Sequence, residues 1–281
     1  MASAAAETET KHLETIDEKD DETFDRPPMV LYSDLCTANF RMLNPKYLSV
    51  YKTLPQIKKL RIGRDNDGGY VCCQLPVNYN LLISCGIADD ISFEEQFVSK
   101  YNCTCIAFDG TIGGLPNPNS PINWVKKNIG TTNDADTTNL TNYIDDYIKH
   151  FQCALPNIFL KMDIEGHEIA WINSIDEKYF EYFQQIIIEF HWPFTPEAAA
   201  AIKKLNKYFM LAHIHGNNAC GMCTFANVNF PNVFECTWIK LTYSMNSYST
   251  DNVPGPLDMP NLPHLEDLNL NHKPFKYGKQ E

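Results

Sequence analysis

Hydrophobic and polar positions follow two alternating patterns along this chain. Short continuous apolar runs that are ended by polar residues are typical of buried strands. Such runs occupy residues 81–87, 103–108, 158–163 and 185–190, and the segments MLAHIH and NVFECTWIKL predict two more. Between the runs, apolar residues recur at helical spacing. A repeated strand–helix order predicts an α/β fold with a mainly parallel sheet.

The expected helices have recognisable starts. Ser92 and Glu95 have the spacing of a capping box, so a helix should begin at Ser92 and run to about Lys100. An apolar stripe predicts a helix over 140–151, and GHEIAWINSI predicts another. Thr195 followed by Pro196 is a helix start, because Thr caps the first turn and Pro fits the first helical position.

The remaining segments are rich in turn-forming residues. We expect short helices or loops over 29–60, then a glycine-rich turn and a short strand within RIGRDNDGGYVCCQL. Residues 113–138 should be a loop, with WVKKNIG as a short edge strand, and the chain should be irregular from about Asn246.

Charge divides the 281 residues into a short acidic start and a longer body. Residues 1–26 hold nine acids and three bases, which predicts a solvated, disordered tail. We expect a single domain over 27–262 and an irregular C-terminal tail over 263–281. The net charge of −12 argues against generic nucleic-acid binding. No run approaches the roughly 20 apolar residues of a membrane span, and no secretory signal is recognised, so a cytoplasmic location is expected.

The ten cysteines are expected to be mostly reduced and buried. Several lie inside apolar runs such as CTCIAF, where a thiol behaves as a small core hydrophobe.

Candidate chemistry lies where the predicted strands end, because ligands of parallel sheets bind outside the carboxyl ends of the strands. Gly86 ends the first strand and Asp109 the second, 23 residues later. That spacing suggests an adenosine-containing cofactor whose ribose is held by Asp109. The alternative is a strand-end turn and a helix-capping aspartate.

The turn after Gly86 narrows the choice of cofactor. A dinucleotide site usually carries G-x-G-x-x-G, and here SCGIADDISFEE has one glycine followed by four acids. Those acids would repel a pyrophosphate but tolerate a cationic sulfonium and an amino group. The sequence therefore favours S-adenosylmethionine over NAD or ATP.

A second group of ionisable residues follows later strands. Glu189 and His191 are two apart and should share one face of their strand, as should His213 and His215. Together with Asp163 and Glu165 they would form either a general-base cluster or a site for a divalent cation. No ligand spacing is diagnostic, so no metal ligand is assigned. Glu165 could instead stabilise a helix N-terminus, and His213 could be a core histidine.

These motifs together resemble the FkbM-type methyltransferases, over roughly residues 60–262. The blocks that carry the resemblance are RIGRDNDGGYV, SCGIADDISFEEQF, AFDGT, LKMDIEGHE, IIIEFHW, HIHGNNACG, PNVFECTWI and VPGPLDMPN. One position departs from the family pattern, because Ala88 stands where a second glycine is frequent.

The resemblance implies a class I methyltransferase fold, which is a doubly wound, Rossmann-like sheet of seven mainly parallel strands. It also implies that S-adenosylmethionine is the cofactor. The cofactor-binding residues it implies are Asp67, Gly68, Gly69, Tyr70, Ser84, Gly86, Ala88, Asp109 and Gly110. The candidate catalytic residues, taken from the strand ends described above, are Asp163, Glu189, His191 and His215.

The resemblance implies O-methyl transfer to a hydroxyl of a carbohydrate or another small polar acceptor. Two alternatives remain open. One is a non-catalytic relative that acts by binding proteins, and the other is an NAD-dependent oxidoreductase, which the acidic turn disfavours. The sequence does not give the oligomeric state.

Overall fold

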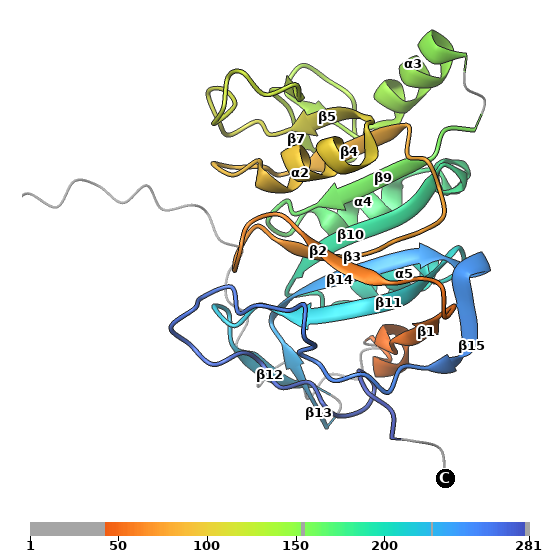
Figure 1. Cartoon of the computed structure of the whole chain (residues 1–281), viewed down its shortest axis with the longest axis vertical. Helices are drawn as coiled ribbons and strands as arrows, with labels where there is room; N and C mark the ends of the chain where they lie inside the picture. Colours follow the sequence, from red (N-terminus) through yellow and green to blue (C-terminus); the bar gives the residue numbers. More distant parts are fainter. Residues whose placement is uncertain (1–42, 153–154, 226, 279–281) are drawn as a thin grey trace, which may run out of the picture. The chain divides into compact units, whose positions relative to one another are not determined.

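A seven-stranded sheet forms the centre of the computed structural model, which describes residues 43–152, 155–225 and 227–278 (Figure 1). The strand order is β11-β14-β10-β9-β4-β5-β6. The strands are β4 (Leu81–Cys85), β5 (Thr104–Phe108), β6 (Asn123–Val125), β9 (Ile158–Met162), β10 (Phe183–His191), β11 (Phe209–Gly216) and β14 (Val233–Lys240). The five strands β6, β5, β4, β9 and β10 run parallel to one another, and β14 is antiparallel to both of its neighbours. The predicted mainly parallel α/β sheet is confirmed.

Later strands are added to both sides of β4. The chain first builds β5 and β6 on one side and then β9 and β10 on the other. The strand order therefore reverses between β4 and β9, and ligands of such sheets bind outside the carboxyl ends of the strands at this point.

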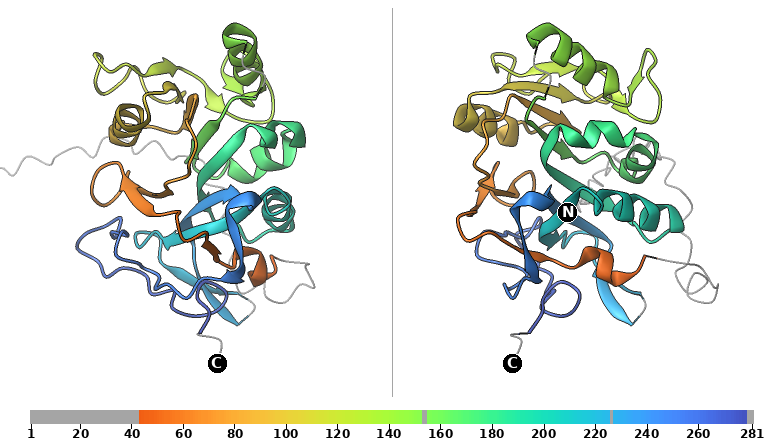
Figure 2. Two further views of the ribbon diagram at one scale, coloured as in Figure 1. Left: turned by 45° about the vertical axis from the view of Figure 1, so that its right-hand side comes forward. Right: turned by 90° about the vertical axis from the view of Figure 1, so that its right-hand side faces the viewer.

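Helices cover both faces of the sheet (Figure 2). The helices α3 (Thr141–Phe151), α4 (Glu168–Ser174) and α5 (Pro196–Leu205) cover one face. On the other face, α2 (Ser92–Tyr101) packs Phe93 and Phe97 against Phe159 of β9, with ring centroids 6.0 and 4.5 Å away. All four predicted helices are present.

The two predicted helix caps have different outcomes. Thr195 caps α5 as expected, because its side chain accepts a hydrogen bond from the backbone N–H of Ala198. The predicted capping box of α2 was wrong. Ser92 is the first residue of the helix, and the N-cap residue of α2 is Ile91, which makes no side-chain hydrogen bond. Asp90 takes over, accepting hydrogen bonds from the backbone and hydroxyl of Ser92, both at 3.0 Å.

The part of the chain that the structure describes also forms four small two-stranded sheets. The strands β2 (Lys59–Ile62) and β3 (Tyr70–Cys73) form an antiparallel hairpin around the predicted glycine-rich turn. The strands β1 (Tyr51–Thr53) and β15 (Ser244–Tyr248) pair with each other, although short helices or loops and irregular chain were expected there. The pairing partners are almost 200 residues apart, so local sequence did not reveal them. The remaining elements are β7 (Asn128–Ile129), β8 (Thr137–Thr138), β12 (Met222–Phe225), β13 (Val228–Pro231), η1 (Pro45–Leu48), η2 (Glu177–Glu181) and η3 (Leu241–Tyr243).

The segment from residue 249 to 278 contains no helix or strand, yet it packs against the rest of the chain. Leu270 and Phe275 are fully buried. The side-chain amide of Asn218 donates hydrogen bonds to the carbonyls of Leu262 and Leu265, at 3.0 and 3.2 Å. Residues 1–26, for which a disordered tail is expected, lie outside the described residues.

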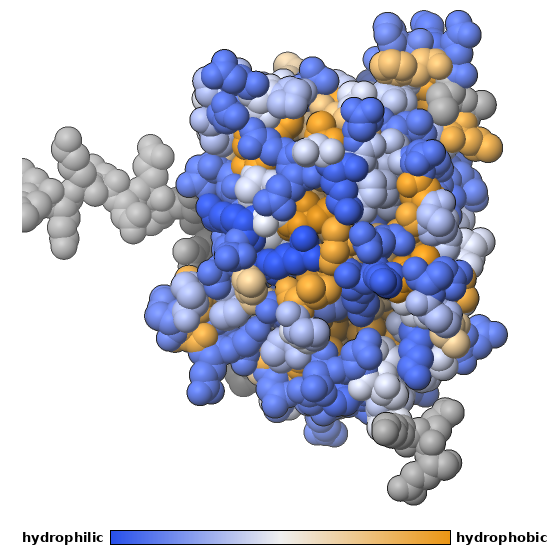
Figure 3. Space-filling model, viewed as in Figure 1, coloured by the Kyte–Doolittle hydropathy of each residue, from blue (hydrophilic) through white to orange (hydrophobic). Residues whose placement is uncertain are grey.

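Hydrophobic residues are mostly inside. Cys72, Cys73, Cys85, Cys105 and Cys236 are buried free thiols, as the sequence predicted for most cysteines. The face shown in Figure 3 is covered largely by polar residues, and hydrophobic residues show through in smaller areas near its centre. Within the described residues, no helix combines the length and apolar character that a membrane span requires.

The backbone at Gly86 touches the loop after β9. Its φ is +74°, and a Cβ atom built there would lie 1.6 Å from the carbonyl oxygen of Asp163. Only glycine fits this contact, because both the left-handed conformation and the missing side chain are required.

Substitution of Gly86 by alanine should therefore destabilise the fold. We expect Gly86→Ala to lower the free energy of unfolding by roughly 2–5 kcal/mol, from backbone strain plus a forced separation of the two loops. Gly113→Ala is the matched control, since an added Cβ at Gly113 meets no heavy atom within 4 Å. Urea denaturation measures both, and equal stabilities of the two variants would contradict the close contact.

Candidate active site

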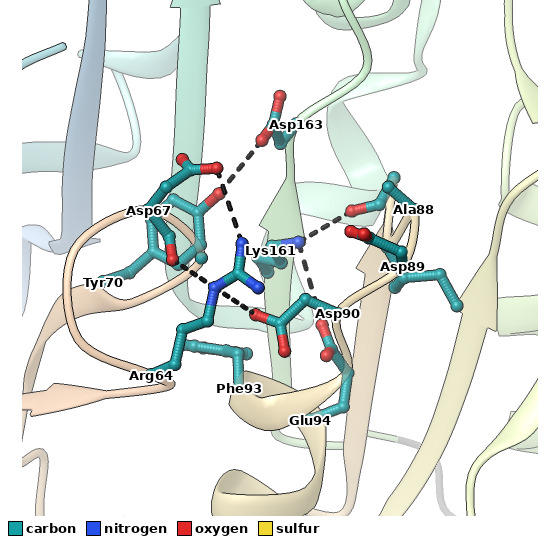
Figure 4. A pocket seen from close by; sticks show the side chains of 13 residues that line it. Arg64, Asp67, Tyr70, Ala88, Asp89, Asp90, Phe93, Glu94, Lys161 and Asp163 are labelled. Carbon is teal, nitrogen blue, oxygen red and sulfur yellow. Dashed lines mark hydrogen bonds and ion pairs between the residues drawn. The ribbon is translucent and has the colours of Figure 1, made fainter. Parts of the chain in front are cut away.

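A pocket opens beside the carboxyl ends of β4 and β9 (Figure 4). It encloses about 410 Å³ of empty space, counting its open mouth. The lining combines the β2–β3 turn, the loop after β4, the first turn of α2 and the end of β9. The lining residues are Arg64, Asp67, Gly68, Tyr70, Gly86, Ile87, Ala88, Asp89, Asp90, Phe93, Glu94, Lys161 and Asp163.

The β2–β3 turn forms one wall because Arg64 ties it to the loop after β4. The guanidinium of Arg64 lies 3.3 Å from the carboxylate of Asp90 and donates to the carbonyl of Asp67 at 2.7 Å. Gly68 also borders Asp90, and a Cβ atom at Gly68 would lie 2.3 Å from its carboxylate. The predicted residues Asp67, Gly68 and Tyr70 therefore line the pocket.

Lys161 supports the floor of the pocket, and the sequence analysis did not assign it. Its ammonium group donates to the carbonyl of Gly86 at 2.7 Å and lies 3.8 Å from Glu94, which is fully buried. Ser84 donates to the same Glu94 oxygen at 2.5 Å. The sequence did offer a signal for Lys161, because a lysine is unusual inside an apolar strand such as IFLKMD. It stands two residues before Asp163.

The pocket lining is acidic. It contains five carboxylates and two basic side chains. Such a surface attracts cationic groups and repels a pyrophosphate.

Asp109 was expected to have a carboxylate free to bind a ribose, but both of its oxygens accept hydrogen bonds from the protein itself. One carboxylate oxygen accepts the backbone N–H groups of Ile87 and Ala88, at 3.2 and 2.9 Å. The other accepts the backbone N–H and the hydroxyl of Thr111, at 2.8 and 2.6 Å. Burial raises the pKa of Asp109, but these hydrogen bonds outweigh burial and leave its pKa below the ordinary value.

Three other predicted cofactor residues do not line the pocket. Ser84 is buried against Glu94. Gly69 and Gly110 fit tight backbone contacts, because a Cβ atom would lie 2.1 Å from the carbonyl of Arg64 and 2.4 Å from the side chain of Asn128, respectively. Close packing of the backbone therefore explains why glycine occupies these two positions.

Asp163, Glu189 and His191 converge beside the pocket. One ligand-type atom from each lies within 4.8 Å of the others. The register explains this arrangement, since Met162 pairs with Ile188 and the next residues of the two strands are Asp163 and Glu189. Burial raises the pKa of Glu189, and the nearby carboxylates of Asp163 and Glu235 raise it further.

Each member of this trio has an outer hydrogen-bond partner. The hydroxyl of Tyr70 donates to Asp163 at 3.0 Å, and the side-chain amide of Asn217 donates to Glu189 at 2.8 Å. The Nδ1 atom of His191 lies 3.1 Å from Glu168, which has no exposed surface.

Glu168 therefore orients His191. Burial lowers the pKa of His191, but Glu168 and the other nearby carboxylates outweigh burial and raise it. The sequence analysis assigned no role to Glu168, although it closes the E-G-x-E part of the most specific block.

His215 does not join the trio. It pairs across the sheet with Glu235, which in turn pairs with Glu189, so it lies two strands away from Glu189. Its Nε2 atom lies 3.0 Å from both oxygens of Asp267. Burial lowers the pKa of His215, and Asp267 and Glu235 raise it to about 10, so at neutral pH this histidine is a buried cation.

His213 is a buried histidine with partners of its own. Its Nε2 atom lies 2.7 Å from Asp258, and its Nδ1 atom lies 3.5 Å from the ammonium group of Lys59. This agrees with the interpretation of His213 as a core histidine.

Three non-glycine residues with left-handed backbones follow successive strands at this edge. They are Ala88 (φ +42°) after β4, Glu165 (+54°) after β9 and Trp192 (+45°) after β10. Strained residues of this kind concentrate at functional sites. Ala88 also accounts for the departure from the family pattern, since a glycine would take the same conformation without strain.

The strand order, the antiparallel β14 and the pocket beside Gly86 together define a class I methyltransferase fold. The family model described as Methyltransferase FkbM domain matches residues 43–221. The chain therefore belongs to the FkbM methyltransferase family, which confirms the resemblance noted from the motifs. No curated protein matches the chain significantly.

Asp109 should stabilise the loop after β4 in a pH-dependent way. Because its pKa in the folded state is lowered, its contribution is present above the unfolded pKa of about 4 and is lost as pH falls through the folded value. We expect Asp109→Asn to lower the free energy of unfolding by roughly 1–3 kcal/mol at pH 7, with a smaller difference below about pH 4.

The control is Asp65→Asn, which changes an exposed aspartate of the β2–β3 turn. Its effect should stay within about 0.5 kcal/mol. Denaturant titrations across pH measure both variants. A loss from Asp109→Asn that is independent of pH would contradict the assignment.

Proposed function

We propose that this protein is an S-adenosylmethionine-dependent O-methyltransferase that acts on a hydroxyl group of a carbohydrate or another small polar molecule. One observation carries the proposal: in a chain of a methyltransferase family, an acid-lined pocket at the switch point of the sheet shares Asp163 with the Asp163–Glu189–His191 trio.

The pocket fits the cofactor by charge. The sulfonium and amino groups of S-adenosylmethionine are cationic, and five carboxylates line the pocket. The ribose contact with Asp109 stays a prediction. Because Thr111 and the backbone already occupy both Asp109 oxygens, a ribose hydroxyl would exchange with the hydroxyl of Thr111. The same acidic lining argues against the pyrophosphate of NAD.

Methyl transfer is an in-line displacement. The acceptor oxygen forms a bond to the methyl carbon as the sulfur–carbon bond breaks, and the bonding electron pair stays on sulfur to give a neutral thioether. The protein contributes mainly by alignment. The acceptor hydroxyl also loses its proton, and the Asp163–Glu189–His191 trio assists that loss.

The surroundings of the trio suit a polar acceptor. The carboxylate of Glu165 lies 3.3 Å from Nε2 of His191, and its side chain is 86% exposed. Trp192 is 48% exposed directly after His191, so a partly open aromatic ring stands beside several carboxylates. An aromatic ring packs against the C–H face of a sugar ring, while carboxylates bind its hydroxyls.

Incubation with S-adenosylmethionine carrying a labelled methyl group, together with a panel of free sugars, tests the proposal. Label should appear on a sugar oxygen, and S-adenosylhomocysteine should form in equal amount. Binding of NAD with no binding of S-adenosylmethionine would reject the proposed chemistry.

Ala88 offers a test of where the cofactor binds. It is exposed and lines the pocket, so Ala88→Leu should fill the pocket without disturbing the core. We expect this change to weaken S-adenosylmethionine binding at least tenfold, which corresponds to about 1.4 kcal/mol. Calorimetry provides the measurement.

Ala200→Leu is the matched control, because Ala200 is an exposed alanine on α5. This variant should bind S-adenosylmethionine as the wild type does. Equal affinity of the Ala88→Leu protein and the wild type would place the cofactor elsewhere.

A further inference from the structure

We infer that Asp163, Glu189 and His191 form a binding site for a divalent cation that prefers oxygen ligands, such as Mg²⁺ or Mn²⁺. Two carboxylates and one imidazole come from the ends of the adjacent strands β9 and β10. One ligand atom from each lies within 4.8 Å of the others. Atoms bound to one such ion at about 2.1 Å lie roughly 3–4 Å apart, so small side-chain rotations bring the three into range.

One oxygen of Asp163 lacks a hydrogen-bond donor in the part of the chain that the structure describes. Among the described residues, its Oδ1 atom is buried and receives no hydrogen bond. Nε2 of His191 lies 3.9 Å from it, which is beyond hydrogen-bond distance. A buried carboxylate oxygen without a donor is costly, and a cation would satisfy it.

The basic side chains that line the pocket are engaged elsewhere. The ammonium group of Lys161 binds the carbonyl of Gly86 and faces Glu94. Arg64 binds Asp90 and the carbonyl of Asp67. Asp163 and the nearly fully buried Glu189 therefore lie together without contact to a lysine or arginine of the pocket lining.

The outer partners of the trio have the pattern of a metal site. Each candidate ligand has one atom fixed from outside: Tyr70 holds Oδ2 of Asp163, Asn217 holds Oε1 of Glu189, and Glu168 faces Nδ1 of His191. Among the contacts of the described residues, Oδ1 of Asp163 is left without a donor, and the closest carboxylate that Nε2 of His191 faces is the exposed one of Glu165, at 3.3 Å. A carboxylate that fixes the far nitrogen of a histidine is the usual outer partner of a metal-ligating imidazole.

Glu168 is itself held rigidly. The same Oε1 atom that faces His191 accepts the backbone N–H groups of Ile164 and Gly166, at 3.2 and 3.0 Å. The loop after β9 therefore fixes both Asp163 and, through Glu168, the ring of His191.

The ligand set selects the class of cation. Two of the three ligands are carboxylates, which favour Mg²⁺ or Mn²⁺, and none is a thiolate, which soft metals favour. The role of the cation rests on the proposed function: it would bind the acceptor hydroxyl and lower its pKa, and the proton would pass to solvent water.

Mn²⁺ binding to the purified full chain tests the site without any acceptor. Electron paramagnetic resonance counts the bound Mn²⁺, and competition with Mg²⁺ shows whether both ions share the site. We expect one Mn²⁺ per chain. Glu189→Gln and Asp163→Asn, which keep side-chain shape, should each weaken binding at least tenfold. Two variants are used so that misfolding of one, checked by circular dichroism, leaves the other informative.

His213→Asn is the matched control, because it removes a buried imidazole that pairs with Asp258 away from the trio. Its Mn²⁺ affinity should equal that of the wild type. Absence of Mn²⁺ binding at concentrations on the order of 1 mM, or wild-type affinity in both carboxylate variants, would overturn the proposal.

Calorimetric titration with S-adenosylmethionine, performed in parallel, separates the two proposals. Cofactor binding without Mn²⁺ binding would reject the cation site alone. Mn²⁺ binding without cofactor binding would support the cation site and reject the proposed methyl transfer.

Discussion

The close backbone contact between Gly86 and Asp163 is the constraint on which the site depends. It brings together the ends of β4 and β9, where the strand order of the sheet reverses. The N–H of Asp163 donates to the carbonyl of Cys85, and Lys161 binds the carbonyl of Gly86. The contact thereby sets the position of the pocket and of the first carboxylate of the trio. A bulkier residue at Gly86 would move both together.

Around this contact the protein places ionisable groups in register across four strands. Asp163, Glu189, Glu235 and His215 form a row over β9, β10, β14 and β11. The cationic His215 lies at one end, between Glu235 and Asp267. The other end borders the pocket, where two carboxylates meet His191. At the His215 end, a cation thus lies between two carboxylates. At the Asp163 end, beside the pocket, two carboxylates share one histidine.

The sequence predicted the main sheet well, because buried parallel strands are continuous apolar runs with clear ends. It also predicted that Asp163, Glu189 and His191 converge, since their positions follow from strand ends and period-two alternation. It did not separate His215 from them, because that distinction depends on Asp267, 52 residues away. Nor did it show that hydrogen bonds within one loop occupy both oxygens of Asp109. Partners fixed by tertiary contact, such as Glu168 for His191, leave only weak local signals.

The irregular segment after β15 supplies Asp258, Asn261 and Asp267 to groups on the sheet. His213 meets its carboxylate 45 residues further along the chain, and His215 meets Asp267 after 52. During synthesis on the ribosome, β11 therefore emerges well before the acids that neutralise its histidines. The histidines of β11 would pair with Asp258 and Asp267 only after this segment has been translated. Folding of this part of the sheet therefore ends with long-range contacts that form late.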